Sequence, residues 1–273
     1  MLPVTILRHH APRTLARLCP VIALTLCLIG CKRQNPNTGQ IPLQHITVYA
    51  PQEMEPIIRA AEAVARNQER GWRIDLQTGG AQTLAWNIDA GDQPDLYIAS
   101  TINMAETLAA SPMRIEPWLY DQLVVVVRAD DPDPILQGPR ALERSTGLIA
   151  VGGTGTQLGD YARLAMRYAE IWPLVERRTS QRTNPEHMIE ALRNGEVDLA
   201  ILFASDAALG GSDVSISERL DLPEKAKVIY TRAIFSNPGA EFANLLQSPA
   251  ALDQARKAGY TPIERDDEPT GDG

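Results

Sequence analysis

Short apolar runs alternate with amphipathic stretches along most of this 273-residue chain. Runs rich in β-branched residues, such as residues 45–50, 73–77 and 96–99, have the length and composition of buried strands. The stretches between them carry apolar residues at helical spacing, as residues 56–65 and 83–90 do. Because helices that alternate with strands cover the faces of a sheet, this pattern predicts an α/β fold with largely parallel sheets.

The alternation is interrupted once and then restarts. The apolar run 122–127 leads into Asp-Asp-Pro-Asp-Pro at residues 130–134, which cannot continue a strand or a helix. A second series of strands and helices follows, and residues 228–230 would carry the chain back to the first series. Since a chain that crosses twice forms a hinge, we expect two α/β lobes joined by two strands, with a cleft between them. The predicted limits are residues 44–124 and 232–262 for lobe 1 and residues 125–231 for lobe 2.

The first thirty residues form a separate unit. Their only charged side chains are three arginines, which precede the apolar stretch 21–29, and this stretch is too short to span a bilayer. It ends in Leu-Ile-Gly-Cys at Cys31, which resembles the bacterial lipobox, whose cysteine is lipidated. We therefore expect residues 1–30 to be a lipoprotein signal peptide and residues 31–43 a flexible tether. The protein would lie on the periplasmic side of the cell envelope, held to the membrane only through Cys31; an uncleaved anchor is the alternative.

Charge and cysteine content narrow the function further. All three cysteines lie at or before Cys31, so the folded part can hold neither a disulfide nor a thiolate metal site. Removal of the signal peptide leaves 23 basic and 34 acidic residues, and this balance makes nucleic acid and anionic lipid poor partners. Residues 263–273 are rich in acidic and turn-forming residues, and we expect them to be disordered.

No motif of a known catalytic site is present in the sequence. The mature chain has only His45 and His187, which are far apart, so a histidine-built metal site is not expected. The glycine-rich turn 153–159 lacks both the glycine spacing of a dinucleotide-binding loop and the lysine of a P-loop. There is no G-x-S-x-G nucleophile motif. We predict that the protein is not an enzyme and that it uses no cofactor. We assign no metal-ligating residue, and a carboxylate-lined metal site stays open.

Several segments share their order and spacing with one family. These are the strand 46–50, the helix and glycine turn 83–91 with the strand 94–100 (Pro-Asp-Leu-Tyr-Ile-Ala-Ser), and the segments 121–126, 159–162, 200–207 and 258–260. Together they resemble the periplasmic molybdate-binding proteins over nearly all of residues 45–262. The resemblance implies a two-lobed type II periplasmic-binding-protein fold with two α/β lobes joined by a two-strand hinge. It also implies a monomer that binds molybdate or tungstate for the permease of an ABC importer.

The ligand positions depart from that family's pattern. There, two serines, backbone amides of the second lobe and a tyrosine bind the oxyanion. The resemblance places the serines on Glu53 and Ala81, the amides on Leu158 and Pro185, and the tyrosine on Phe203. Leu158 can still donate its backbone N–H, and Ala81 can lie at a helix N-terminus that favours anions. Pro185 has no N–H and Phe203 has no hydroxyl.

Glu53 is the sharpest departure, because a carboxylate about 4 Å from an anion costs roughly 4 kcal/mol at an intermediate dielectric. Either Glu53 faces solvent at the start of a helix, or it recognises a cation or an amine-bearing ligand. A shift of one residue would instead place Gln52 in the cleft. In the turn 153–159, Thr156 could supply a hydroxyl that replaces a missing serine. The candidate ligand-binding residues are therefore Gln52, Glu53, Ala81, Gln82, Thr156, Leu158, Pro185 and Phe203.

The sequence predicts an extracytoplasmic solute-binding protein, and it leaves an alternative from a different class open. A diverged relative could act as an envelope sensor or interaction module that delivers no cargo. A clamp-fold enzyme would need a titratable pair in the cleft, and the sequence does not identify one.

Overall fold

The computed structural model of this protein describes residues 43–138 and 140–263. The predicted signal peptide, nearly all of the predicted tether and nearly all of the predicted acidic tail lie outside these residues. In the described ranges, no helix combines the length and the apolar character that a membrane span requires.

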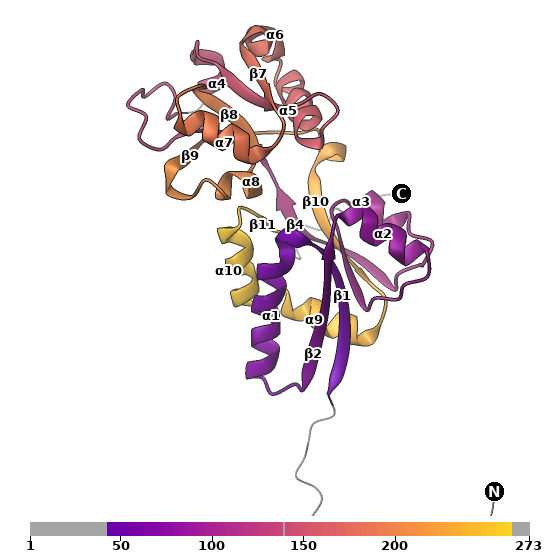
Figure 1. Ribbon diagram of the computed structural model, residues 1–273. Helices are drawn as coiled ribbons and strands as arrows, with labels where there is room; N and C mark the ends of the chain where they lie inside the picture. The colour runs from indigo at the N-terminus through magenta and orange to yellow at the C-terminus, as the bar shows by residue number, and fades with distance from the viewer. Residues whose placement is uncertain (1–42, 139, 264–273) are drawn as a thin grey trace, which may run out of the picture. The chain divides into compact units, whose positions relative to one another are not determined.

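The first sheet has six strands (Figure 1). In chain order they are β1 (Gln44–Pro51), β2 (Trp72–Gly79), β3 (Leu96–Ala99), β4 (Arg114–Asp121), β10 (Val228–Ile234) and β11 (Thr261–Pro262). They lie side by side in the order β11-β4-β10-β3-β1-β2. β1 pairs in parallel with β2 and β3, whereas β10 runs antiparallel to β3 and β4, and β11 antiparallel to β4.

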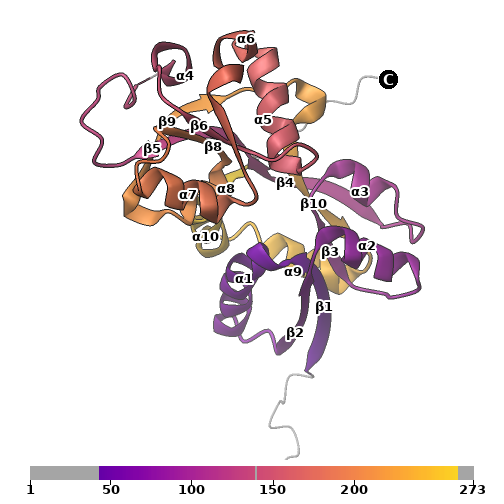
Figure 2. The ribbon, with the colours of Figure 1, turned by 45° about the horizontal axis from the view of Figure 1, so that its top comes forward.

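Helices cover both faces of this sheet. They are α1 (Glu55–Asn67), which follows the 3-10 turn η1 (Gln52–Met54), and α2 (Ala81–Asp89), α3 (Ile102–Glu106), α9 (Asn237–Leu245) and α10 (Pro249–Lys257). Ile46 and Val48 of β1 share a buried cluster with α1, α9 and α10, whereas Tyr49 packs with Leu84 of α2. Figure 2 shows α2 and α3 on the opposite side of β1 and β3 from α1 and α9. Burial on both faces explains why the run at β3 is apolar throughout.

The second sheet has five strands, in the order β7-β6-β8-β5-β9. They are β5 (Leu123–Arg128), β6 (Ile149–Gly152), β7 (Thr179–Arg182), β8 (Leu199–Phe203) and β9 (Val214–Leu220). Its helices are α4 (Ala141–Arg144), α5 (Gln157–Tyr168), α6 (Trp172–Val175), α7 (Pro185–Arg193) and α8 (Ala204–Ala208), with 3-10 turns at η2 (Glu176–Arg178), η3 (Gly211–Asp213) and η4 (Glu224–Ala226). β6 is parallel to β7 and β8, and β5 is antiparallel to β8 and β9.

The expectation of largely parallel sheets is therefore wrong, because both sheets are mixed. The antiparallel pairs all involve strands that lie next to a passage of the chain between the sheets, or the short terminal strand β11. A strand that enters a sheet from its neighbour need not follow the βαβ connection that enforces parallel pairing.

The chain passes between the sheets at two places. β4 ends at Asp121 and β5 begins at Leu123, so the first passage is the single residue Gln122. The second passage lies between β9 and β10, in residues 221–227. The apolar run 122–127 lies almost wholly in the second sheet as β5, whose paired strands are β8 and β9.

Side-chain caps fix several of the helix starts. Thr101 accepts a hydrogen bond from the Met104 N–H at 3.2 Å and thereby caps α3. Asn184, Ser236 and Ser248 cap α7, α9 and α10 in the same way, and a proline follows in the first turn of each. These local signals therefore fix where α3, α7, α9 and α10 begin.

Candidate functional site

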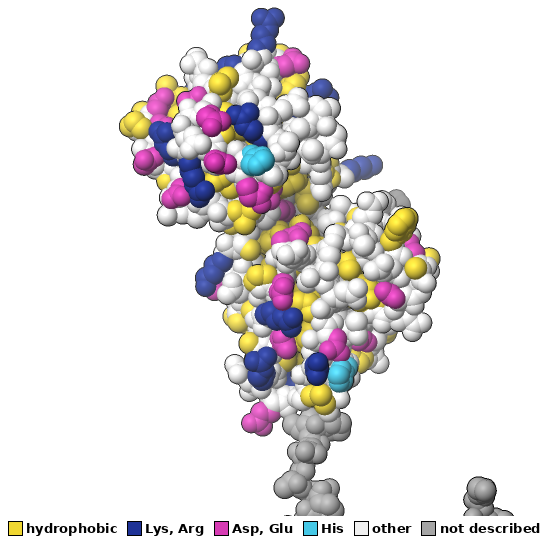
Figure 3. Space-filling view, viewed as in Figure 1, with side chains coloured by type: hydrophobic (Ala, Val, Ile, Leu, Met, Phe, Trp, Pro, Cys, Tyr) yellow, Lys and Arg dark blue, Asp and Glu magenta, His cyan; other side chains and the backbone are white. Residues whose placement is uncertain are grey.

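A cavity of about 900 Å³ lies where the two sheets meet, and residues from both of them line it. The first sheet and its helices contribute the start of α1, the end of β4, the start of β10 and the end of α10. The second contributes the start of α5, the start of α7, and the end of β8 with α8. Figure 3 shows apolar and acidic side chains gathered between these two groups of elements. A concave site of this size, lined by apolar groups with a few polar ones, is typical of a small-molecule site.

The floor of the cavity is the first passage between the sheets. Asp121, which is 2% exposed, accepts hydrogen bonds from the Ser205 Oγ at 2.6 Å and from the Ser205 N–H at 3.3 Å. The Ala204 N–H donates to the Gln122 carbonyl at 2.8 Å. Burial raises the pKa of Asp121 to about 6, while the bonds from Ser205 act in the opposite direction. The end of β4 is thereby tied to the start of α8.

A third segment closes the floor from the first sheet's side. Gly259 follows α10 with a φ of +89°, and a Cβ built on it would lie 2.1 Å from the Ala204 carbonyl oxygen. Only glycine allows both this backbone conformation and this approach. Next to it, the Tyr260 ring meets the Tyr230 ring edge to face, with 5.3 Å between the centroids. The three chain segments at the floor are therefore closely packed.

Glu53 faces the cavity from the first sheet's side. Its side chain lines the cavity, and its Oε1 accepts a hydrogen bond from the Tyr230 hydroxyl at 3.2 Å. The residue is also exposed, so its carboxylate is accessible to solvent and to a solute. Burial is the main cause that raises the pKa of the Tyr230 hydroxyl, and this hydroxyl stays protonated as the donor. The structure thus directs Glu53 toward the cleft.

Asp206 faces the same cavity from the first turn of α8. Its pKa is raised to about 7, first by burial and then by the negative charges of Asp121, Glu186 and Glu53. Four carboxylates therefore share one cavity, and three of them act on Asp206.

Lys257 is the one cationic side chain among the described residues that line the cavity. It forms an ion pair with Asp253, one turn back on α10, with Nζ and Oδ2 at 2.8 Å, and it is 65% exposed. A surface pair of this kind places its charge mostly in water. The cavity therefore carries a net negative charge.

The structure brings half of the predicted ligand residues together. Gln52, Glu53, Leu158 and Phe203 all line the cavity. Leu158 lies in the first turn of the twelve-residue helix α5, and Phe203 ends β8 with its ring against Tyr161, at a centroid distance of 5.9 Å. That these residues contact a ligand stays a prediction.

The other four predicted residues are not among those that line this cavity. Ala81 begins α2, and its carbonyl accepts a bond from the Tyr97 hydroxyl at 2.8 Å. Gln82 lines a separate hollow of about 270 Å³ between α2 and α3. Pro185 begins α7, and its neighbour Glu186 lines the cavity instead. Thr156 caps α5: its Oγ1 donates to the Gly153 carbonyl at 2.8 Å and accepts from the Gly159 N–H at 3.1 Å.

Several residues that line the cavity were missed in the sequence, chief among them Asp121, Glu186, Asp206, Tyr230 and Tyr260. A signal existed for two of them. Asp121 ends β4 and Asp206 lies three residues after the end of β8, and polar residues near the carboxyl ends of strands are frequent in ligand clefts. Tyr230 and Tyr260 give no such signal, because Tyr230 lies within the apolar strand β10 and Tyr260 in the short connection between α10 and β11.

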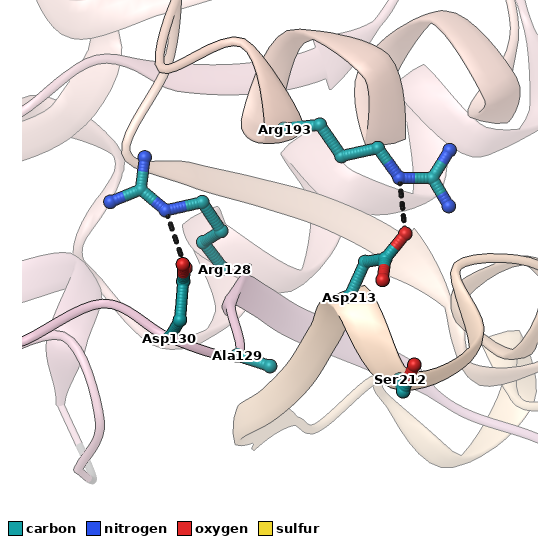
Figure 4. A pocket seen from close by; sticks show the side chains of 6 residues that line it. All are labelled: Arg128, Ala129, Asp130, Arg193, Ser212 and Asp213. Carbon is teal, nitrogen blue, oxygen red and sulfur yellow. Dashed lines mark hydrogen bonds and ion pairs between the residues drawn. The ribbon is translucent and has the colours of Figure 1, made fainter.

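A third hollow, of about 290 Å³, lies at the far end of the second sheet (Figure 4). Its two arginines are each paired with an aspartate: Arg128 Nε lies 2.8 Å from Asp130, and Arg193 Nε lies 2.9 Å from Asp213. In the close-up the two guanidinium groups point away from each other, so they do not converge on one ligand. Across residues 43–138 and 140–263, no group of three or more His, Cys, Asp or Glu side chains is arranged to hold a metal ion.

Comparisons with known proteins identify the class. The model of the bacterial extracellular solute-binding protein family matches residues 46–261, which is most of the chain, so this chain belongs to that family. No curated protein matches the chain significantly. The predicted family resemblance and the two-lobed periplasmic-binding-protein fold are both confirmed by the family and by solved structures.

Three of these structures illustrate the fold. The substrate-binding domain of a protein assigned as a molybdenum ABC transporter from Clostridium difficile is 16% identical, with a TM-score of 0.72 over 81% of this chain and 99% of that one. The periplasmic molybdate-binding protein of Azotobacter vinelandii is 14% identical, with a TM-score of 0.51 over 80% and 100%. Iron-bound HitA from Pseudomonas aeruginosa is 16% identical, with a TM-score of 0.55 over 81% and 87%. These proteins are named for different ligands, so the shared fold does not fix the ligand.

Proposed function

We propose that this protein is a monomeric solute receptor of an ABC importer, and that it holds its solute in the cavity between the two sheets. The family and the position of the cavity support this proposal. In the proposed arrangement, the chain passes from lobe 1 to lobe 2 at Gln122 and returns to lobe 1 within residues 221–227. Both positions lie a few residues from the limits predicted from the sequence. A solute that contacts both walls would favour the closed arrangement of the lobes.

The receptor would be anchored to the cell envelope, on its periplasmic side, through a lipid on Cys31. The support for this is the sequence at residues 21–31 alone. In a host that processes lipoproteins, the full chain should fractionate with membranes and incorporate labelled fatty acid. The variant Cys31→Ser should do neither, and a variant that still takes up the label would refute the anchor.

The solute that this cavity favours is an organic molecule with a positively charged group. One observation carries the choice: Glu53, Asp121, Glu186 and Asp206 all line the cavity, and Lys257 is directed to Asp253. An oxyanion about 4 Å from a single carboxylate would lose roughly 4 kcal/mol at an intermediate dielectric, whereas a cation would gain a similar amount.

The aromatic wall supports an organic solute. The rings of Phe203, Tyr230 and Tyr260 line the same cavity as the carboxylates. Aromatic faces bind both apolar chains and cationic groups, so an ammonium or guanidinium group with a carbon skeleton suits this lining.

Molybdate or tungstate is the second candidate, and one observation favours it. Leu158 lines the cavity in the first turn of α5, where its backbone N–H and the helix dipole are favourable to an anion. Two of the similar structures are also of proteins named for molybdenum or molybdate.

A thermal-shift comparison separates the two candidates. The mature chain is heated with agmatine, cadaverine, molybdate or tungstate, each at the same concentration. A ligand at about a thousand times its Kd should add roughly 4 kcal/mol of stability, which raises Tm by about 10 °C. We expect a shift with a cationic solute and none with the oxyanions.

Two charge variants serve as matched controls. Glu53→Gln should weaken binding of a cation by roughly three- to tenfold, and Lys257→Gln should leave it unchanged or strengthen it. If an oxyanion is the ligand, the two variants should act in the reverse sense. A molybdate shift that grows in Glu53→Gln and shrinks in Lys257→Gln would replace our choice of solute by the second candidate.

A further inference from the structure

The two aspartates of the cavity differ in how their charges are compensated. Asp121 accepts two hydrogen bonds from Ser205, and backbone groups of Gln122 and Ala204 also stabilise its carboxylate. Asp206 is the very next residue after Ser205, but among the main influences on its carboxylate only the Phe203 backbone is stabilising. Asp206 is therefore a partly buried carboxyl group that lacks the donors its neighbour has.

The groups that face Asp206 increase this imbalance. Three carboxylates act on it, one from each of three elements: Asp121 at the end of β4, Glu186 on α7 and Glu53 on η1. On the β10 and β11 side, the hydroxyl groups of Tyr230 and Tyr260 are neutral, since burial raises the pKa of both. On α10, Lys257 is paired with Asp253. Lys257 is the one described cation that lines the cavity, and its ion pair is with Asp253 and not with Asp206.

We propose that Asp206 is the residue that makes the cavity specific for a positive charge, by holding a proton while the cavity is empty and releasing it when the solute's cationic group binds. This inference rests on the proposed function. In the exchange, the carboxyl O–H bond breaks and the proton passes to solvent. The carboxylate that remains then pairs with the ammonium or guanidinium group, so one positive charge replaces another and the net charge of the site is the same before and after binding.

The arrangement of the cavity explains why Asp206 can do this and Asp121 cannot do it as easily. Because its pKa is raised to about 7, Asp206 loses its proton to solvent near neutral pH at little cost when a cation binds. Asp121 is 2% exposed and its oxygens are occupied by Ser205, so a solute cannot pair with it without breaking those bonds. A neutral solute of the same shape would leave Asp206 protonated and would gain no ion pair.

The exchange makes binding depend on pH in a defined direction. Below about pH 7 the empty cavity holds the proton, and a cation must displace it. Affinity should therefore rise about tenfold per pH unit as pH increases toward 7, and it should level off above that value. Titration of Asp121, whose pKa is raised to about 6, should steepen the dependence below pH 6.

The first test needs no solute. Carboxyl ¹³C NMR of the mature, empty protein should show one aspartate that titrates near pH 7, and this resonance should be missing from the spectrum of Asp206→Asn. Asp213→Asn, which removes an exposed carboxylate at the far end of the second sheet, should leave the resonance in place. If the resonance that is lost in Asp206→Asn does not titrate between pH 6 and 8, the inference is overturned.

The second test uses agmatine as the probe. Calorimetric titrations in two buffers of different ionisation enthalpy should show about one proton released per agmatine bound to the unaltered protein at pH 6. In Asp206→Asn, binding should be weaker and should release fewer protons. Since the first titration uses the unaltered chain, a folding defect in the variant would not affect it.

The outcomes distinguish the two proposals. Agmatine or cadaverine binding without proton release would overturn the role of Asp206 and leave the receptor proposal intact. If neither amine binds at any pH while molybdate does, both the cationic solute and the proton exchange are wrong. Proton release that disappears in Asp206→Asn would establish the exchange.

Discussion

The glycine-rich turn 153–159 and the strand ends at the cavity floor contrast in how they use their polar groups. In the turn, Thr156 both donates and accepts within the turn, and Thr154 accepts a bond from Arg163 at 3.1 Å. Around the floor, Glu53 and Asp206 line the open cavity, and few donors compensate their carboxylates. A motif that looks like a ligand loop is thus largely satisfied by itself, whereas residues without a motif present unbalanced charge to a solute.

The largest expected effect concerns the close packing at the floor. Gly259→Ala would force a Cβ to within 2.1 Å of the Ala204 carbonyl in a left-handed conformation. Overpacking and backbone strain together should lower the free energy of unfolding by about 3 kcal/mol or more. Thermal unfolding should show Tm lowered by about 6–12 °C.

A matched glycine provides the control for that change. A Cβ on Gly80, before α2, would meet nothing closer than 3.8 Å, and its φ is negative. Gly80→Ala should change Tm by no more than a degree or two. Equal losses in the two variants would mean that the floor is not the tightly packed region we describe.

The next effect concerns the Ser205 hydroxyl at the floor. Ser205→Ala removes the 2.6 Å hydrogen bond to Asp121 and should cost about 2 kcal/mol of stability at pH 7, since that bond stabilises a buried charge. Ser212→Ala, at the far end of the second sheet, should cost less than about 0.5 kcal/mol. Chemical denaturation of both variants measures the difference.

The pH dependence of the Ser205 variant sharpens this prediction. The folded pKa of Asp121, about 6, lies above its unfolded value, so this residue's contribution to stability is greatest in acid and falls as pH rises through 6. Without the Ser205 hydroxyl, the ionised form of Asp121 is less stable in the folded protein than it is in the unaltered chain. The cost of Ser205→Ala should therefore shrink as Asp121 is protonated at pH 5. If the loss of stability is the same at pH 5 and pH 7, Ser205 does not act by stabilising the charge of Asp121.

The smallest effect concerns the turn. Thr156→Ala removes the cap of α5 and should cost about 1 kcal/mol, while Thr156→Ser should retain most of the stability. Solute affinity, measured by calorimetry, should change little in either variant. A large loss of affinity with no loss of stability would restore the turn as a ligand-binding element, and the contrast with the floor would fail.

Much of the fold follows from the sequence because buried strands such as β1, β3 and β8 are apolar runs bounded by turn residues. The missed strands have different compositions. β7 consists of the four polar or charged residues Thr179–Arg182, and β4 includes Pro117 between charged and apolar residues. Their place in a sheet depends on pairing with distant strands, which local composition does not reveal.

The site follows from the sequence less completely. Alignment with a family places residues such as Glu53 and Leu158 at the cavity, since it preserves the order of strands and turns. The alignment does not show which polar groups already have hydrogen-bond partners. Thr156 has such partners within its turn, whereas the carboxylate of Asp206 has few. Nor does the alignment show that Glu186, one residue beyond the predicted Pro185, is the side chain that lines the cavity.

The two passages between the sheets are unequal, and this bears on how the protein can move. One is the single residue Gln122, tied on both sides by hydrogen bonds, and the other spans residues 221–227. A connection of one residue provides no slack for translation, so it acts as a pivot, while the longer connection can follow a swing. Any opening and closing of the cavity should therefore be a rotation centred near Gln122. Because the cavity floor lies beside that pivot, a small solute there would contact the part of the molecule that moves least and would limit the travel of the outer walls the most.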